Sequence, residues 1–133
     1  MIKANELRIE NFISISPIYH KDDIRIVYLK MLNAIENGFE VFGIPLTEDI
    51  LLKLGFVSTS IQGDILTLFL SDSDKNEFSR QRIDFWKNNQ DGKVELCRGG
   101  VCFKMVICKY VHQLQNIYFA LTGEELQINL NTL

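Results

Sequence analysis

A β-hairpin is predicted by residues 95–104, which read Glu95-Leu96-Cys97-Arg98-Gly99-Gly100-Val101-Cys102-Phe103-Lys104. The Gly99-Gly100 pair suits a two-residue turn, because glycine readily adopts the positive φ angles that tight hairpin turns need. A turn at this pair sets Cys97 opposite Cys102. The same register supplies an apolar pair and an opposite-charge pair, namely Leu96 with Phe103 and Glu95 with Lys104. Alternate apolar residues of the second strand then share one face, which we expect to lie in the core: Val101, Phe103, Met105 and Ile107.

Two short helices are predicted, at about 47–54 and 109–122. Thr47 is a good N-cap for the first helix, and Gly55 can end it in the left-handed conformation. The second helix has one apolar stripe at helical spacing and Gly123 as its stop. Strands are expected at 65–70, 83–87 and 125–130, where strand-forming residues dominate or alternate with polar ones. The predicted core includes Leu51, Leu54, Phe56, Leu68, Phe103, Met105, Leu114, Tyr118 and Leu121.

Residues 22–36 fit two structures. Their apolar residues recur at helical spacing after Asp22-Asp23, and Gly38 can end such a helix. The same stretch is rich in Ile, Val and Tyr and runs into Asn37-Gly38, so strands joined at a tight turn fit as well. Periodicity alone slightly favours the helix.

The composition is that of a folded globular chain. The 133 residues are 47% hydrophobic and 23% charged, so we expect one domain spanning residues 1–133. No apolar run approaches the length of a membrane span and the N-terminus soon reaches charged residues, so a cytoplasmic location is expected. The net charge of −3 is uneven: residues 36–74 hold seven acids and one base, whereas residues 75–110 hold eight bases and four acids. These halves either balance each other within the fold or attract a charged partner.

Three stretches carry a family resemblance: Lys3–Ile9 (KANELRI), Gly43–Phe56 (GIPLTEDILLKLGF) and Tyr110–Leu126 (YVHQLQNIYFALTGEEL). Together they resemble a family of small uncharacterised proteins of Bacteroides-type bacteria, their prophages and phages. The resemblance implies a genomic setting and no activity. It also implies a small barrel-like N-terminal part with strands at 24–32 and 39–44. Relatives usually carry a Gly-Asn pair where this chain has Glu10-Asn11, which puts the tight turn there in doubt.

The predicted 109–122 helix has an amide-rich face formed by His112, Gln113, Gln115 and Asn116. A helix face in full contact with water usually carries Lys and Glu instead, so this face is predicted to dock on protein. Hydrogen bonding inside the chain is the favoured form of docking. Binding to a partner, or to a second copy of the chain, is the alternative.

Neither a metal, a cofactor nor a catalytic set is predicted. Cys97, Cys102 and Cys108 lack the spacing of zinc-binding cysteine pairs and are expected to be small buried residues. The hairpin register allows a Cys97–Cys102 bridge, which a reducing cytosol would keep open. No carboxylate lies three or four residues from His112 to orient its ring.

The sequence predicts a non-enzymatic accessory protein or protein-interaction module of a phage or prophage, with an unknown protein partner or self-association. The alternative is a nucleic-acid-binding module that uses the basic and aromatic stretch 75–104. Basic side chains neutralise phosphates and aromatic ones stack on bases. The candidate contacts are Arg80, Arg82, Trp86, Lys87, Lys93 and Arg98.

Overall fold

The computed structural model describes residues 1–18, 20–70, 81–88 and 92–128. Its main element is a five-stranded antiparallel sheet in the order β3-β4-β5-β6-β7. The strands are Val57–Ser58, Ile65–Phe69, Gln81–Trp86, Lys93–Arg98 and Val101–Ile107. A second, two-stranded sheet pairs β1 (Phe12–Ser14) with β2 (Ile24–Ile26). The helices are α1 (Leu29–Glu36), α2 (Glu48–Lys53) and α3 (Val111–Thr122), with 3-10 turns at Ala4–Glu6 and Lys21–Asp23.

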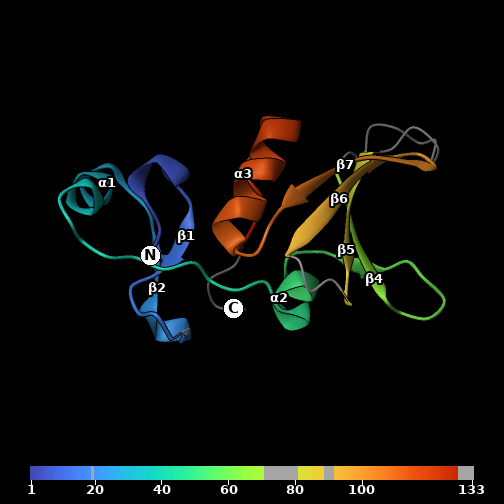
Figure 1. Ribbon diagram of the computed structural model, residues 1–133, viewed down its shortest axis with the longest axis horizontal. Helices are drawn as coiled ribbons and strands as arrows, with labels where there is room; N and C mark the ends of the chain where they lie inside the picture. The colour runs from blue at the N-terminus through green and yellow to red at the C-terminus, as the bar shows by residue number, and fades with distance from the viewer. Residues whose placement is uncertain (19, 71–80, 89–91, 129–133) are drawn as a thin grey trace.

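The predicted α+β class with mainly antiparallel strands is confirmed. Helix α3 lies between the N-terminal elements and the five-stranded sheet, and α2 lies beside the lower end of that sheet (Figure 1). The barrel-like N-terminal part is not found, because the described N-terminal strands form only the two-stranded ribbon β1–β2. A ribbon of three residue pairs is too short to close on itself.

Helix α2 forms as its sequence predicts. The Thr47 hydroxyl accepts a hydrogen bond from the Ile50 N–H at 3.2 Å, and Gly55 follows the helix with φ +101°. The Phe56 N–H then donates to the Leu51 carbonyl at 3.1 Å, which returns the Phe56 ring to the core. A polar cap, a left-handed glycine and a returning aromatic residue together define this helix.

Residues 24–32 and 39–44 are not the strands that the family resemblance implied. The strand ends at Ile26 and α1 begins at Leu29, while 39–44 contributes only an isolated bridge between Phe42 and Ser14. The pairing stops because Ile26 already lies opposite Phe12, the first residue of β1, and the chain turns at Glu10-Asn11 just before that residue. After Ile26 the apolar residues at helical spacing favour a helix, because α1 then places Met31, Leu32 and Ile35 on the N-terminal core.

Two apolar clusters flank β1. The larger one joins the inner face of the five-stranded sheet to α2 and α3, and the smaller one lies among the N-terminal segment, β1 and α1. Phe12 belongs to the larger cluster and Ile13 to the smaller one, because neighbouring strand residues point to opposite faces. All three residues of β1 are therefore buried.

The β6–β7 hairpin keeps the predicted turn but not the whole predicted register. Cys97 pairs with Cys102, and a bulge then shifts the pairs to Leu96 with Lys104 and Glu95 with Met105. Phe103 is the additional residue on β7. A bulge of this kind cannot be seen in a pattern of alternating residues, which assumes one residue opposite each partner.

The core prediction is wrong for β7. Val101, Phe103, Met105 and Ile107 are between 56% and 64% exposed, because β7 is the last strand of the sheet and the helices cover other strands. The predicted core is otherwise confirmed, with Tyr118 and Leu121 half-buried against it. In the predicted strand 125–130, residues 125–128 are irregular and residues 129–130 lie outside the described part.

Glu10 occupies a tight turn that glycine would adopt more easily. Its φ is +79°, and the Asn11 N–H donates to the Arg8 carbonyl at 3.1 Å across the turn. The side chain of Asn11 accepts from the Arg8 N–H at 2.6 Å. The turn doubted on sequence grounds is therefore formed, at the energetic cost of a left-handed residue with a side chain.

Replacing Glu10 with Gly should stabilise the protein by about 1 kcal/mol, because it removes the left-handed penalty. The expected rise in melting temperature is about 4 °C. The control Glu10→Ala removes the carboxylate but keeps the Cβ atom, and it should give no such rise. An unchanged or lower melting temperature for Glu10→Gly would contradict this account of the turn.

Candidate functional site

Gln115, from the predicted amide-rich face, is buried and joins α3 to the start of β1. Its side-chain oxygen accepts a hydrogen bond from the Phe12 N–H at 2.7 Å, and its side-chain nitrogen donates to the Glu10 carbonyl at 3.1 Å. Only 2% of Gln115 is exposed. One carboxamide therefore satisfies a donor and an acceptor of a backbone segment 103 residues away.

Asn116 extends this junction toward Arg8. The Asn116 side-chain oxygen accepts from the Arg8 Nε at 2.8 Å and from the Asn11 side-chain nitrogen at 2.9 Å. Arg8 also forms an ion pair with Glu125 at 2.6 Å, and its guanidinium lies 4.2 Å from the centre of the Phe119 ring. The N-terminal and C-terminal stretches of the family resemblance thus bind each other.

Gln113 and His112 complete the face. The Gln113 side-chain oxygen accepts from the Lys109 and Tyr110 N–H groups at 2.7 and 3.2 Å, which caps α3. The buried His112 ring stacks on Tyr110 with 5.8 Å between ring centres, and its Nδ1 has no hydrogen-bond partner in the described part of the chain. A cavity of about 270 Å³ lies here, with Glu6 also in its lining. Burial lowers the pKa of His112, while the Glu6 carboxylate acts in the opposite direction.

The amide-rich face is therefore turned into the molecule. Hydrogen bonding within the chain, the favoured alternative, is confirmed for Gln113, Gln115 and Asn116. The interpretation of this face as a partner's docking surface stays a prediction, which the internal hydrogen bonds disfavour. Side chains as buried as His112 and Gln115 cannot reach a partner without opening the fold.

The described candidates for nucleic-acid contact do not all lie on one face of the sheet. Arg82 pairs with Asp84 at 3.3 Å and donates to the Gly99 carbonyl, and Lys87 pairs with Glu48 at 2.8 Å. Trp86 is 40% exposed at the end of β5. Lys93 and Arg98 lie on opposite faces of β6, since an odd number of positions separates them. Arg80 lies outside the described residues.

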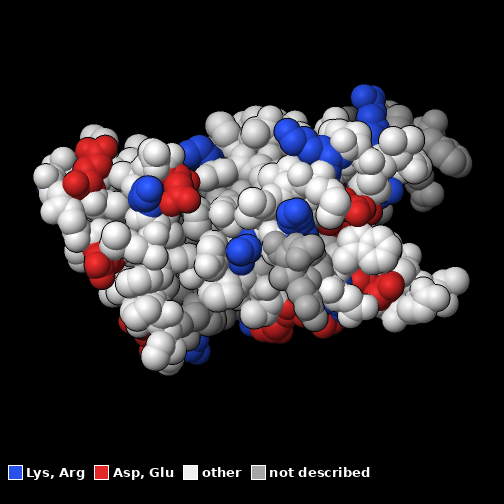
Figure 2. Space-filling view, in the orientation of Figure 1, with Lys and Arg blue, Asp and Glu red and all other residues white. Residues whose placement is uncertain are grey.

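We name the exposed apolar side chains of β7 the β7 edge: Val101, Phe103, Met105 and Ile107. The bulge at Phe103 places Val101 on one face of the sheet, opposite Arg98, and Met105 and Ile107 on the other face, opposite Glu95 and Lys93. On its inner side β7 pairs with β6, and no described strand lies along its outer side. Lys104 lies in the middle of the strand and Lys109 follows it. Figure 2 shows Lys and Arg side chains over β6 and β7 within a largely uncharged surface.

Cys97 and Cys102 are joined by a disulfide, in the pairing that the predicted register allowed. The expectation from the sequence was that a reducing cytosol would keep this bridge open. Cys97 is 1% exposed, whereas Cys102 is exposed. The bridge connects β6 to β7 directly behind the Gly99-Gly100 turn and therefore fixes the start of the edge strand.

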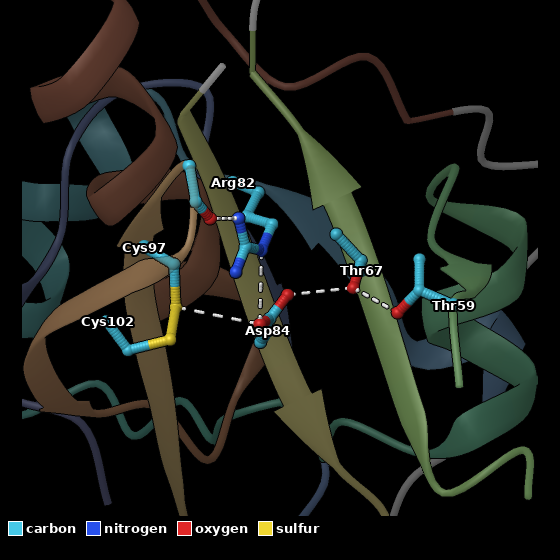
Figure 3. Close-up of a disulfide and its surroundings, with 7 residues drawn as sticks. Thr59, Thr67, Arg82, Asp84, Cys97 and Cys102 are labelled. Carbon is cyan, nitrogen blue, oxygen red and sulfur yellow. Dashed lines mark hydrogen bonds and ion pairs between the residues drawn. A yellow bond between two sulfur atoms is a disulfide. The ribbon is translucent and has the colours of Figure 1, made fainter. Parts of the chain in front are cut away.

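A polar cluster lies beside this disulfide on the sheet face that the helices leave open (Figure 3). The buried Asp84 accepts a hydrogen bond from the Thr67 hydroxyl at 2.7 Å, and Thr67 is 2.8 Å from the Thr59 hydroxyl. Arg82 pairs with the other Asp84 oxygen. Sequence spacing missed this cluster, because Asp84 and Cys97 meet only through the pairing of β5 with β6.

Comparisons with family models, with curated proteins and with solved structures found no match. None of the described helices has both the length and the apolar character that a bilayer crossing requires.

Gln115→Ala should destabilise the protein by about 2–4 kcal/mol, because it leaves the Phe12 N–H and the Glu10 carbonyl buried without partners. The melting temperature should fall by roughly 10 °C. The exposed Gln62 offers a matched control, and Gln62→Ala should change the stability by less than about 0.5 kcal/mol. Equal stability of the two variants would rule out the structural role of Gln115.

Acidification should weaken the fold through His112. Its pKa is lowered in the folded state from the ordinary value of 6.5, so the unfolded chain binds the proton more readily. The stability is complete above pH 6.5 and is lost as the pH falls from there through the lower folded-state pKa. Urea unfolding at pH 7.5 and 5.5 should show a smaller loss for His112→Phe than for the natural chain. His20→Phe, at an exposed position, should keep the full loss, and identical losses in all three would refute the assignment.

Proposed function

We propose that this protein is a non-enzymatic protein-interaction module whose β7 edge binds an extended segment of another protein. The bound segment would alternate apolar with acidic residues and add a sixth strand to the sheet. The observation that carries the proposal is the set of four large apolar side chains on an edge strand, each more than half exposed, with Met105 and Ile107 together on one face.

The backbone of an edge strand favours this mode of binding. Its outward N–H and C=O groups can pair with an incoming strand, which is how many sheets bind extended peptides. Covering apolar side chains adds affinity, at about 25 cal/mol for each Å² removed from water. Contacts made by every second side chain of the bound strand then determine which sequences bind.

The charge around the β7 edge selects an acidic partner. Lys104 lies in the middle of β7 and Lys109 follows the strand, and no acidic residue occurs between residues 96 and 110. A second copy of the chain fits less well. The antiparallel register that sets Val101 against Ile107 of the second copy also sets Lys104 against its own equivalent, and like charges directly opposite are unfavourable.

Nucleic acid also binds basic surfaces, but the ion pairs within this chain favour a protein partner over nucleic acid. Arg82 and Lys87 are already held by carboxylates of the chain, which lowers the positive charge left for phosphates. The exposed apolar side chains of the β7 edge are poorly suited to bind a phosphate backbone. The genomic setting in a phage or prophage is supported by the family resemblance alone.

The experiment measures the binding of labelled eight-residue peptides by fluorescence anisotropy. One peptide alternates Val with Glu, and its matched control alternates Val with Lys. We expect the Glu peptide to bind at least tenfold more tightly. Met105→Ser should weaken that binding at least tenfold, whereas Ile61→Ser, at a fully exposed loop position, should not. Lys104→Glu should shift the preference toward the Lys peptide.

Three results would overturn the proposal. The first is equal binding of both peptides, or none. The second is a mass of two chains by light scattering that Met105→Ser returns to one, which would make a second copy the occupant. The third is a salt-dependent gel shift with DNA or RNA that Lys104→Glu abolishes, which would favour the nucleic-acid alternative.

A further inference from the structure

We propose that the reduced protein binds one Zn²⁺ through Cys97, Cys102, Asp84 and Glu95. These residues, which we name the sulfur–carboxylate cluster, offer four ligand atoms that all lie within 4.8 Å of one another. The site adjoins the β7 edge, because Cys102 lies on β7, but metal binding here does not depend on peptide binding there. The site is formed by cross-strand pairing rather than by close spacing in the sequence.

The sheet register brings the four side chains together. Asp84 pairs with Glu95 across β5 and β6, and Cys97 pairs with Cys102 across β6 and β7. Glu95 and Cys97 are two positions apart on one strand and therefore point to the same face. Three adjacent strands thus contribute donors to one point on the open face of the sheet.

The donor set suits zinc. Zn²⁺ prefers four ligands of the thiolate, imidazole and carboxylate types in a tetrahedral arrangement. With bond lengths of about 2.3 Å to sulfur and 2.0–2.2 Å to oxygen, the ligand atoms of such a site lie roughly 3.3–3.8 Å apart. The cluster reaches this arrangement by small side-chain rotations once the two sulfurs separate, because its atoms are already within 4.8 Å.

Neighbouring groups hold the carboxylate ligand in place. The Thr67 hydroxyl donates to one Asp84 oxygen and the Arg82 Nε to the other, while Asp84 is only 6% exposed. Metal-binding carboxylates are typically oriented by such hydrogen bonds. The positive charge of Arg82, together with Zn²⁺, would offset three of the four negative charges of two thiolates and two carboxylates.

An Asp84 oxygen lies 3.6 Å from the Cys97 sulfur (Figure 3). A disulfide sulfur carries no hydrogen, so this contact becomes an S–H···O hydrogen bond only after reduction. Cys102 is exposed, which gives a reductant access to the bridge. With a phosphine reductant, the disulfide takes up two electrons and two protons to give two thiols. The phosphine takes the oxygen of one water molecule and becomes the phosphine oxide.

Cys108 is not a competing ligand. It is 1% exposed, and burial raises the pKa of its thiol to about 12, so it stays protonated near neutral pH. Thiolate, not thiol, binds the metal. Cys108→Ala therefore serves as a matched control for substitutions within the cluster.

The test uses Co²⁺ as a probe of the zinc site, in full-length protein reduced with a phosphine and freed of excess reductant. We expect one Co²⁺ per chain, with the sulfur-to-cobalt charge-transfer band and the visible bands of tetrahedral Co²⁺, and loss of these bands when Zn²⁺ is added. The oxidised natural chain, identical in sequence, should show none of them. Cys102→Ser should abolish the charge-transfer band, and Glu95→Gln should weaken Co²⁺ binding about tenfold. Cys108→Ala should bind as the natural chain does.

Two results would overturn the proposal. Absence of the charge-transfer band in the reduced natural chain at millimolar Co²⁺ excludes the site. Binding that persists unchanged in Cys102→Ser shows carboxylate binding without sulfur, which also excludes it. Circular dichroism of each variant checks that the sheet is formed. If Cys102→Ser does not fold, the comparison of reduced with oxidised natural chain decides the question.

Discussion

The carboxamide of Gln115 connects the two halves of the molecule. It reaches from α3 to the backbone on both sides of Asn11, so the first strand is fixed against a helix that the chain forms more than a hundred residues later. The position of β1 in turn determines both cores, because Phe12 packs toward the large sheet and Ile13 toward α1. Without this pair of hydrogen bonds, the Phe12 N–H and the Glu10 carbonyl would lose their side-chain partner on α3. Arg8 and Asn116 reinforce the same junction from its exposed side.

Helices α2 and α3 pack on one face of the five-stranded sheet. The residues that stabilise the fold therefore lie on one face, and the reactive and proposed metal-binding groups lie on the other. The covered face holds the apolar core, with Leu66, Ile83 and Val94 on its central strands. The open face holds the disulfide and the buried carboxylate of Asp84. At its margin β7 is paired on one side only. The surfaces that can bind a ligand or react are thus those that the helices do not cover.

Local sequence signals predicted the structure well where residues adjacent in the sequence determine it. Helix α2, the stop of α3 at Gly123 and the Gly99-Gly100 turn all follow from capping and turn residues. The errors arose where the structure depends on contacts between residues that are distant in the sequence. The β7 residues alternate like a core strand, but their burial depends on which strand is last in the sheet. Residues 29–36 follow helical periodicity once β1 offers no further partner. Likewise, no spacing in the sequence places Asp84 beside Cys97, since only the strand order does.

The junction between Arg8 and Glu125 has a consequence for how the protein is made. The two residues are 117 positions apart, and the Gln115 bonds span 103 and 105 positions. During synthesis the N-terminal elements emerge first and can pack on one another, but their partners on α3 and Glu125 are translated more than a hundred residues later. Phe12 then remains uncovered on the growing chain, and contacts this distant close slowly because the loop between them must lose its freedom first. The two-stranded ribbon therefore completes its packing late, and truncation near the C-terminus would leave the beginning of the chain without its binding partner.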